Sequence, residues 1–291
     1  ARLWRKIKTE KLPFDEEIIN KKKSGETYFA QLNITPVLDS KREVEFFVGV
    51  ERDITYLKEM DKVKNEFISI ASHQLRTPLS SIKWLCELLW KSDLTRLSDD
   101  QKDMMRKVQN ENDRLIKLVN SLLNISRIEQ NKMVVSPSLT DIPELVETVL
   151  NDFKDSIRTK NQTVEVNFSP ETPKVFVDVK LVSEALNNLI SNAHKYTSKG
   201  GRLWIKGKVS GNELVISVVD NGIGIPINDQ HRIFEKFFRA GNAFLKQTGG
   251  TGLGLYFVKW VVESHGGRVW FESKENIGTT FFLAFPLIDR R

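Results

Sequence analysis

The sequence is short of cysteine, of long apolar runs and of charge of one sign. Its one cysteine, Cys86, excludes an internal disulfide and a zinc cluster built on several thiolates, and it favours a reducing, cytoplasmic setting. No apolar run reaches the roughly 18 residues of a membrane span, so any membrane anchor would lie outside this chain. The first residues contain neither a Met nor the apolar core of a signal peptide, and we expect a fragment or a processed chain.

The charge is nearly balanced, with 44 Lys and Arg residues against 38 Asp and Glu residues. The net charge of +6 is spread as +1, +3 and +2 over residues 1–66, 67–138 and 139–291. The one tight basic run, Lys21–Lys23, precedes a Ser-Gly pair typical of turns, and we interpret it as a solvated hairpin loop. We therefore expect no nucleic-acid partner.

Three common nucleotide-site signatures are also absent. The pattern Gly-x-x-x-x-Gly-Lys-Ser/Thr does not occur, which excludes a P-loop. The His-Arg-Asp and Asp-Phe-Gly signatures of the usual protein kinases are missing as well. The glycine motif at 250–254 is not preceded by a strand of a βαβ unit, which argues against a dinucleotide fold.

What is present divides into three segments, and the first of them, residues 14–56, is predicted to form strands. The stretches 28–35 and 45–50 are rich in β-branched and aromatic residues and are bounded by turn residues. On these residues alone, the segment is a small β-meander.

From Ile54 the pattern becomes helical. Apolar residues spaced by three, four and three form a seam typical of coiled coils: Met60, Val63, Phe67 and Ile70. Ser98 is the predicted N-cap of a second amphipathic helix that runs to about Gln130, and a polar connection, Lys91–Leu97, joins the two. Such an antiparallel helical hairpin has a wide apolar face, so we expect two copies to form a dimeric four-helix bundle.

From residue 132 onward, helices and strands alternate. Asp141, with Glu144 three residues later, predicts a capping box that opens a helix to about Arg158. Further helices are expected near 179–196 and 252–265, with strands near 163–168, 202–209, 213–220, 268–273 and 279–286. Helices on one face of a mixed sheet predict an α+β sandwich.

The first candidate site is His73, in the run His-Gln-Leu-Arg-Thr-Pro on the first long helix. His73 lies three residues beyond Ile70, at the margin of the apolar seam. Pro78 removes an amide donor and crowds the carbonyl of Gln74, so a bend is expected just after the histidine. An imidazole at such a place has an accessible lone pair and can act as a nucleophile. The alternative is a partly buried polar residue with no special function.

The second candidate site is the helix that carries Asn188, Asn192, Lys195 and Tyr196. The two asparagines, four residues apart, share one face, and amide oxygens are ligands that Mg²⁺ accepts beside phosphate and water. Lys195 offers a positive charge for a phosphate and Tyr196 an aromatic face for a base. The alternative is a solvated polar face. His194, within this helix, is interpreted as a surface or pocket-rim residue, and His265 as part of a structural helix cap.

Two glycine motifs form the third candidate site. Asp220 opens the first, with Gly222 and Gly224, and the second has three glycines spaced by two: Gly250, Gly252 and Gly254. Such spacing lets backbone amides approach an anionic or planar ligand, and Asp220 at a strand end could accept a hydrogen bond from an exocyclic amine. The intervening segment, with aromatic residues at 234–238 followed by Arg239, is predicted to be a mobile lid.

Taken in order, these motifs resemble those of the sensor histidine kinases of two-component systems. The resemblance runs from about residue 57 to 288, and residues 1–55, with the exit Asp-Ile-Thr into a helix, resemble the C-terminal part of a PAS sensor domain. It implies a multidomain protein: a partial PAS β-sheet at 1–55, a dimerisation and histidine-phosphotransfer hairpin at 56–131, and a catalytic ATP-binding domain of the Bergerat (GHKL) fold at 132–291.

The resemblance also implies an ATP-dependent protein-histidine kinase that signals as a homodimer. His73 would be the autophosphorylated nucleophile and would pass its phosphoryl group to an Asp of a response-regulator receiver domain. Thr77 matches the position that helps to place a hydrolytic water in the phosphatase reaction. Whether phosphorylation occurs in cis or in trans would depend on the handedness of the turn at Lys91–Leu97.

ATP and Mg²⁺ are the implied ligands of the third segment. Asn188 and Asn192 would sit at Mg²⁺, and Lys195 and Arg239 at the phosphates. The groups that would surround the nucleoside or shape the pocket and its lid are Tyr196, Asp220, Gly222, Gly224, Gly250, Gly252 and Gly254.

Gln74 departs from the family pattern, in which Glu or Asp commonly follows the phosphoacceptor. An amide oxygen can still accept the Nδ1–H of His73, but it cannot stabilise an imidazolium. Two alternatives follow: a nucleotide-gated scaffold or phosphatase-biased partner, to which Gln74 lends weight, and a Bergerat-fold ATPase. The ATPases place a water-activating Glu four residues before the metal-binding Asn, where this chain has Asn188.

Overall fold

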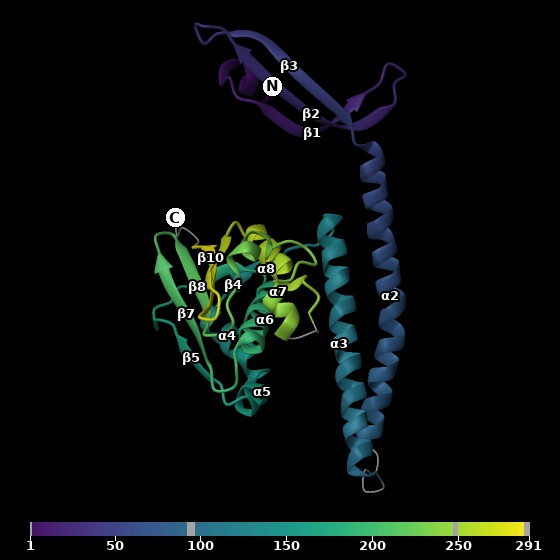
Figure 1. Cartoon of the computed structure of the whole chain (residues 1–291), viewed down its shortest axis with the longest axis vertical. Helices are drawn as coiled ribbons and strands as arrows, with labels where there is room; N and C mark the ends of the chain where they lie inside the picture. Colours follow the sequence, from purple (N-terminus) through teal and green to yellow (C-terminus); the bar gives the residue numbers. More distant parts are fainter. Residues whose placement is uncertain (1, 92–96, 247–249, 288–291) are drawn as a thin grey trace. The chain divides into compact units, whose positions relative to one another are not determined.

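The computed structural model describes residues 2–91, 97–246 and 250–287 (Figure 1). Two compact units are present, residues 1–74 and 75–291. The turn at 92–96, whose handedness bears on cis or trans phosphorylation, lies outside the described residues, as do residues 247–249 of the expected lid.

The first unit contains the predicted β-meander. After α1 (Arg2–Trp4) and a π-helical turn, η1 (Arg5–Thr9), three antiparallel strands follow in the order β1 (Phe14–Lys21), β2 (Thr27–Leu38) and β3 (Val44–Asp53). The turn between β1 and β2 holds Gly25 at φ +93°, which confirms the hairpin loop expected after the basic run. The exit from β3 is fixed because Asp53 Oδ1 accepts the Thr55 N–H at 2.9 Å.

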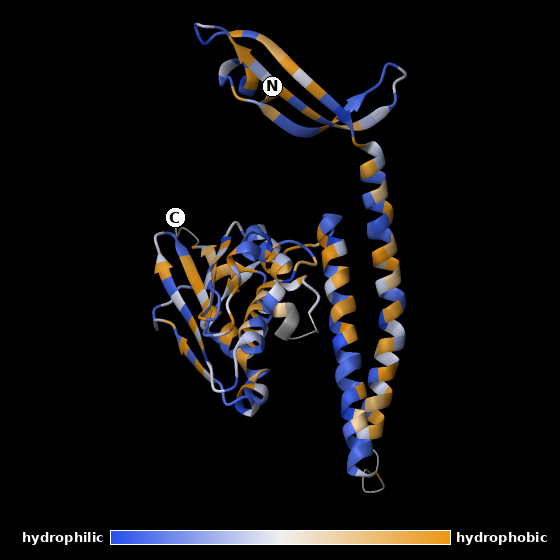
Figure 2. Cartoon of the chain, viewed as in Figure 1, coloured by the Kyte–Doolittle hydropathy of each residue, from blue (hydrophilic) through white to orange (hydrophobic). Residues whose placement is uncertain are grey.

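The long helix α2 (Thr55–Lys91) continues through Pro78, and the bend expected just after His73 stays a prediction. The second helix, α3 (Asp99–Glu129), begins as predicted, because Ser98 and Gln101 form a reciprocal capping box. Within the second unit the two helices pack through Leu79 against Val119 and Leu123, and Asn112 donates to the Leu79 carbonyl at 3.1 Å. Apolar residues recur along both helices in Figure 2.

The α+β part of the second unit is built on a five-stranded mixed sheet. The strand order is β5 (Thr163–Asn167), β7 (Arg202–Ser210), β8 (Glu213–Asp220), β10 (Gly278–Pro286) and β9 (Arg268–Lys274), with only the β5–β7 pair parallel. Strand β8 alternates buried and half-buried residues, as a sheet covered on one face requires. The covering helices are α4 (Ile142–Asn151), α6 (Val179–Tyr196) and α8 (Gly254–Ser264).

The single helix expected from the Asp141 cap to about Arg158 was predicted wrongly. Asp141 caps α4 by accepting the Glu144 N–H, but the helix ends at Asn151 and α5 (Lys154–Thr159) follows. The Asp152 and Phe153 amides bond back only three residues, which tightens the chain into a turn. The pattern also gave no sign of the small pair β4 (Ser138–Thr140) and β6 (Val175–Val177), of η3 (Ile227–Arg232) or of α7 (Gly241–Lys246).

Candidate functional site

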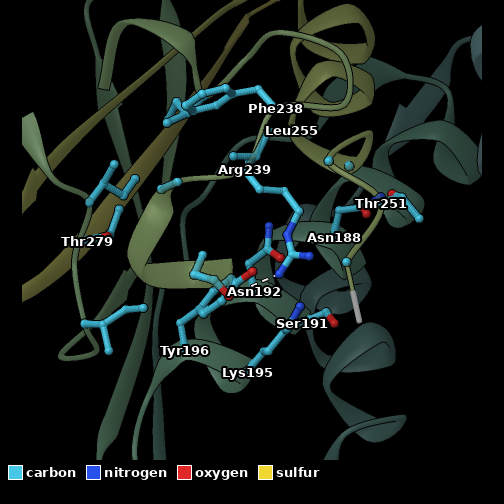
Figure 3. A pocket seen from close by; sticks show the side chains of 18 of the residues that line it. Asn188, Ser191, Asn192, Lys195, Tyr196, Phe238, Arg239, Thr251, Leu255 and Thr279 are labelled. Carbon is cyan, nitrogen blue, oxygen red and sulfur yellow. Dashed lines mark hydrogen bonds between the residues drawn. The ribbon is translucent and has the colours of Figure 1, made fainter. Parts of the chain in front are cut away.

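A cavity of about 570 Å³ opens above the sheet, and its lining draws together most of the predicted binding residues (Figure 3). The lining includes Asn188, Asn192, Lys195, Tyr196, Asp220, Gly224, Arg239, Gly250, Gly252 and Gly254. Gly222 lies just behind this wall, and residues of α3, among them Lys117 and Ser121, complete the lining.

Helix α6 presents the amide side chains. Asp178 caps its N-terminus by accepting the Lys180 and Leu181 N–H groups, and the apolar face of the helix is buried in the core. Asn188 donates through Nδ2 to the Glu184 carbonyl at 2.9 Å, so its Oδ1 points away from the helix backbone and faces Gly254. A Cβ on Gly254 would lie 2.6 Å from that oxygen. The glycine therefore gives the Asn188 carbonyl its place at the cavity.

Asp220, at the end of β8, is a buried carboxyl group. Its side chain is 9% exposed, and its Oδ1 accepts the Gly222 N–H at 2.8 Å. Burial raises the pKa of Asp220 to about 6, against the lowering effect of the Gly222 and Thr279 amides. A carboxylate held in this way is a strong and directional hydrogen-bond acceptor at neutral pH.

The first glycine motif lets the chain pass close to two other backbones. A Cβ on Gly222 would lie 2.7 Å from both Asp220 Oδ1 and the Tyr196 carbonyl oxygen. Gly224 has φ +64°, and its Cβ would lie 2.1 Å from the Lys274 carbonyl oxygen. No side chain fits at either position without a backbone shift, so this wall of the cavity depends on glycine.

We expect Gly224→Ala to destabilise the protein far more than Gly211→Ala. Both glycines have positive φ, +64° and +59°, so both substitutions carry the strain of about 1 kcal/mol that an L-residue meets there. Gly211 faces open space, whereas the Gly224 methyl group would collide with the Lys274 carbonyl. Denaturant unfolding should show at least about 2 kcal/mol between the two variants; equal losses would contradict the close approach.

Two cationic side chains converge near the second glycine motif. A Cβ on Gly250 would lie 3.2 Å from Lys195 Nζ and 3.3 Å from Arg239 Nε, so both groups lie against this backbone (Figure 3). A lysine and an arginine beside a glycine-rich backbone make a site for an anion of high charge. Gly252, at φ +70°, packs on the Phe237 and Phe238 carbonyls.

The segment predicted to be a lid is anchored by an aromatic residue. Phe234 packs edge-on against Phe271 and Phe281, with ring centroids 5.9 and 6.4 Å apart. Phe237, by contrast, is 60% exposed and adopts φ +63°. One end of the segment is thus held in the core, and its mobility stays a prediction.

The three residues of the phosphoacceptor motif, His73, Gln74 and Thr77, lie on α2 with exposed side chains. Thr77 belongs to the second unit and does not line the cavity. The exposure of His73 agrees with an imidazole at the margin of the apolar seam.

Two other histidines have structural surroundings. His194 is half-buried and bonded to Gln162, and it does not line the cavity, so of the two expected places the pocket rim is not the one observed. His265 accepts the Asp178 N–H through Nε2 at 2.8 Å and contacts the Val261 carbonyl through Nδ1 at 2.7 Å, which agrees with a structural role. Cys86 is buried, as expected.

Sequence analysis missed Thr279, which is buried and lines the cavity. Thr279 pairs directly with Asp220 across β8 and β10, and its backbone N–H bonds to the Asp220 carboxyl group. Thr279 stands at the start of the last predicted strand. This position indicates a site residue only if one already knows that this strand pairs with the strand that ends at Asp220.

Among the described ranges, no group of three or more His, Cys, Asp and Glu side chains is arranged to hold a metal ion. Likewise, no helix in the described part of the chain combines the length and apolarity needed to cross a membrane.

Comparison with known protein families accounts for most of the chain. Residues 1–56 match the PAS domain, residues 63–131 match the His Kinase A (phospho-acceptor) domain, and residues 177–289 match the histidine kinase-, DNA gyrase B-, and HSP90-like ATPase family. The chain belongs to the sensor histidine kinases. The partial PAS sheet, the helical hairpin and the α+β ATPase domain are therefore the fold that the motifs predicted.

Several sensor histidine kinases are similar to this one over most of its length. The sensor protein kinase WalK of Staphylococcus haemolyticus is 31% identical over 267 residues, 90% of this chain and 43% of the relative. The sensor histidine kinase WalK of Bacillus subtilis (strain 168) is 31% identical over 280 residues, 94% of this chain and 44% of the relative. The chain thus spans less than half of the length of these curated relatives.

Among solved structures, full-length ShkA in complex with AMPPNP is similar in fold and sequence. The TM-score is 0.62 and the identity 26%, over 76% of this chain and 45% of that one.

Proposed function

We propose that this chain is an ATP-dependent protein-histidine kinase that phosphorylates His73 and passes the phosphoryl group to an aspartate of a receiver domain. The observation that carries the proposal is the cavity, in which a buried carboxyl group, two amide side chains and two cations face one space. Residues 1–55 would form the partial sensor domain, 56–131 the dimerisation and phosphotransfer hairpin, and 132–291 the catalytic domain.

The cavity suits a nucleoside triphosphate in size and in chemistry. Its volume lies within the range typical of small-molecule sites. Asp220 would accept a hydrogen bond from the exocyclic amine of adenine, and Tyr196 would pack beside the nucleoside. Lys195 and Arg239, which meet near Gly250, would bind the phosphates. The AMPPNP bound to ShkA supports a nucleotide in the related domain.

Asn188 and Asn192 fit a magnesium ion that is bound together with phosphates. Both line the cavity four residues apart on α6, and the Asn188 Oδ1 is not the atom that bonds to the helix backbone. Two neutral amide oxygens suit Mg²⁺ when phosphate oxygens and waters complete its ligands. When bound, the ion supplies positive charge that neutralises the transferring phosphoryl group.

The chemical step needs little from the protein beyond placement. A ring nitrogen of His73 attacks the γ-phosphorus, the N–P bond forms, and the bond from phosphorus to the bridging oxygen breaks as ADP leaves. Gln74, next along the helix, would accept the Nδ1–H through its amide oxygen and leave Nε2 as the attacking atom. An exposed imidazole on α2 is open to such an approach and to a receiver domain afterwards.

The apolar seam of α2 supports a homodimer. Its four residues are more than half exposed: Met60 51%, Val63 60%, Phe67 70% and Ile70 64%. Apolar residues at coiled-coil spacing that are left open to water are typical of a helix that packs against another helix. A second copy of the hairpin would cover this seam in a four-helix bundle.

We expect Gln74→Glu to increase the rate of autophosphorylation by about tenfold, less than the full effect of a general acid or base, because Gln74 can already orient the ring. A carboxylate stabilises the positive charge that develops on the imidazole during attack, whereas the amide of Gln74 only orients the ring. Gln74→Leu, which removes the acceptor, should react more slowly than wild type. The measurement is the initial rate of label incorporation at saturating ATP, and a Gln74→Glu rate no higher than wild type would contradict the role.

The proposed function is tested by incubating the chain with γ-labelled ATP and Mg²⁺ and examining the stability of the bound label. A phosphoramidate bond predicts label that is lost in acid and retained in base, and that moves to a receiver domain in a chase. Label that survives acid, or bound ATP without any label, would contradict the proposal. The second outcome would favour a nucleotide-gated scaffold.

A further inference from the structure

Gln162, between α5 and β5, is a buried amide that sits at the end of α6. It is 7% exposed. Its Nε2 lies 3.1 Å from the His194 carbonyl oxygen, 3.0 Å from that of Thr197 and 3.3 Å from that of Ser198. Its Oε1 lies 2.5 Å from His194 Nδ1. A single side chain thus contacts three carbonyls and one ring of the same turn.

These contacts fix the orientation of both side chains. An amide nitrogen surrounded by three carbonyl oxygens must be the donor, so the Gln162 oxygen is the acceptor and His194 Nδ1 carries the proton.

The carbonyls at the end of a helix have no partner within the helix, and they carry partial negative charge. Lys160 acts on the same group, because its Nζ donates to the His194 carbonyl at 2.9 Å and to that of Lys195 at 3.4 Å. Backbone bonds from Gly200 to Lys160 and from Thr163 to Gly201 tie the following loop to the same strand. The end of α6 is therefore held from the β5 side.

The turn held in this way carries the cavity side chains Lys195 and Tyr196, with Asn192 less than one turn earlier. The Tyr196 carbonyl also lies where a Cβ on Gly222 would come within 2.7 Å, so the loop of Asp220 packs directly on it. A shift of this turn would displace both the Lys195 and Tyr196 side chains and the loop that follows Asp220. Gln162 itself does not line the cavity.

We propose that Gln162, oriented by His194, is a positioning residue for the nucleotide: it holds the backbone of residues 194–198 so that Lys195 and Tyr196 point into the cavity. The inference rests on the proposed function of the cavity. Gln162 acts only through other residues, so its removal weakens nucleotide binding without removing any group that touches the nucleotide.

The test compares Gln162→Leu with Val149→Ala in the full chain. Leucine fills the space of Gln162 without its hydrogen bonds. Val149, buried on α4 in the core that α6 shares, is a core control that takes no part in the hydrogen bonds of Gln162. Titration calorimetry with ATP and Mg²⁺ should show a Kd raised about tenfold in Gln162→Leu and unchanged in Val149→Ala. Both variants should have a lower Tm, which separates binding from general stability.

A second pair of variants addresses the histidine and stays informative if Gln162→Leu does not fold. His194→Asn keeps a donor near the place of Nδ1, and His194→Leu removes it, so only the leucine variant should lose affinity. Amide hydrogen exchange without nucleotide should be faster at residues 194–198 in His194→Leu than in His194→Asn.

Two results would overturn this inference: wild-type affinity in both leucine variants, or an equal loss of affinity in Val149→Ala. A wild-type chain that binds ATP but gives no labelled histidine would contradict the proposed kinase and leave the positioning role standing. A wild-type chain that binds no ATP would overturn both.

Discussion

Replacing His73 by Gln should remove all acid-labile label from the protein and leave its affinity for ATP unchanged. Glutamine has the size and polarity to remain on the exposed face of α2, but its amide nitrogen has no lone pair available for attack on phosphorus. Because the substitution alters none of the side chains that we propose bind ATP, the Kd for ATP should equal that of wild type. The measurement pairs label incorporation with titration calorimetry on the same preparation.

His231→Gln is the matched control for this experiment. His231 is also an exposed histidine, on η3, and it neither lines the cavity nor belongs to the phosphoacceptor motif. This variant should incorporate label as wild type does. Label retained in His73→Gln would place the nucleophile elsewhere, and lost ATP affinity would mean that the variant had damaged the cavity.

Asp220→Ala should weaken ATP binding by about 100-fold or more. Removing one partner of a buried, charge-assisted hydrogen bond loses about 3 kcal/mol, which is roughly a factor of 100 in Kd. The substitution also leaves the Gly222 N–H without the acceptor that now lies 2.8 Å away. Titration calorimetry at pH 7.5 measures the loss, and an affinity within threefold of wild type would contradict the role of Asp220.

The raised pKa of Asp220 gives the site a dependence on pH. The carboxylate that accepts a hydrogen bond from the ligand is protonated as the pH falls through about 6, so wild-type ATP affinity should fall between pH 7.5 and 5. Asparagine at position 220 gains no proton over this range. The ATP affinity of Asp220→Asn should therefore be weaker than that of wild type and should show no pH dependence from this group. A wild-type affinity that is equally flat would contradict the involvement of this group.

The same pKa predicts that Asp220→Asn stabilises the fold at pH 7.5. The folded-state pKa of about 6 lies above the usual 3.8, so the folded protein binds this proton more tightly than the unfolded chain. The buried carboxylate therefore destabilises the fold by about 3 kcal/mol above pH 6, and the penalty fades as the pH falls from about 6 towards 3.8. Unfolding at pH 7.5 should show Asp220→Asn regaining part of this energy while it loses ATP affinity.

Much of the fold could be predicted because local signals and packing agree. Ser98 caps α3 as its side chain and Gln101 predict, and the apolar seam of α2 has the spacing of a helix that packs against others. The split between α4 and α5 could not be predicted, since the apolar pattern continues across it. At the split, Phe153 lies beside His194 with ring centroids 6.2 Å apart, a contact between residues 41 positions apart in the sequence that the local pattern does not reveal.

The candidate site shows the same division. Asp220 and the glycines could be found from their spacing, because turns that approach another backbone require glycine. Thr279 and Gln162 could not, because their importance comes from the strand partner opposite Asp220 and from carbonyls more than thirty residues away. The importance of both residues depends on contacts with residues far away in the sequence, and no local pattern in a single sequence indicates those contacts.

The central claim, that ATP bound in the cavity phosphorylates His73, is tested most directly by mapping the phosphoryl group on the wild-type chain. The protein is incubated with ATP and Mg²⁺, digested at neutral or basic pH and analysed by mass spectrometry, with Asp220→Ala treated in parallel. We expect one phosphorylated site, on His73, in the wild-type chain and almost none in the variant. Phosphate on a serine or threonine, or equal phosphorylation of the two chains, would contradict the account.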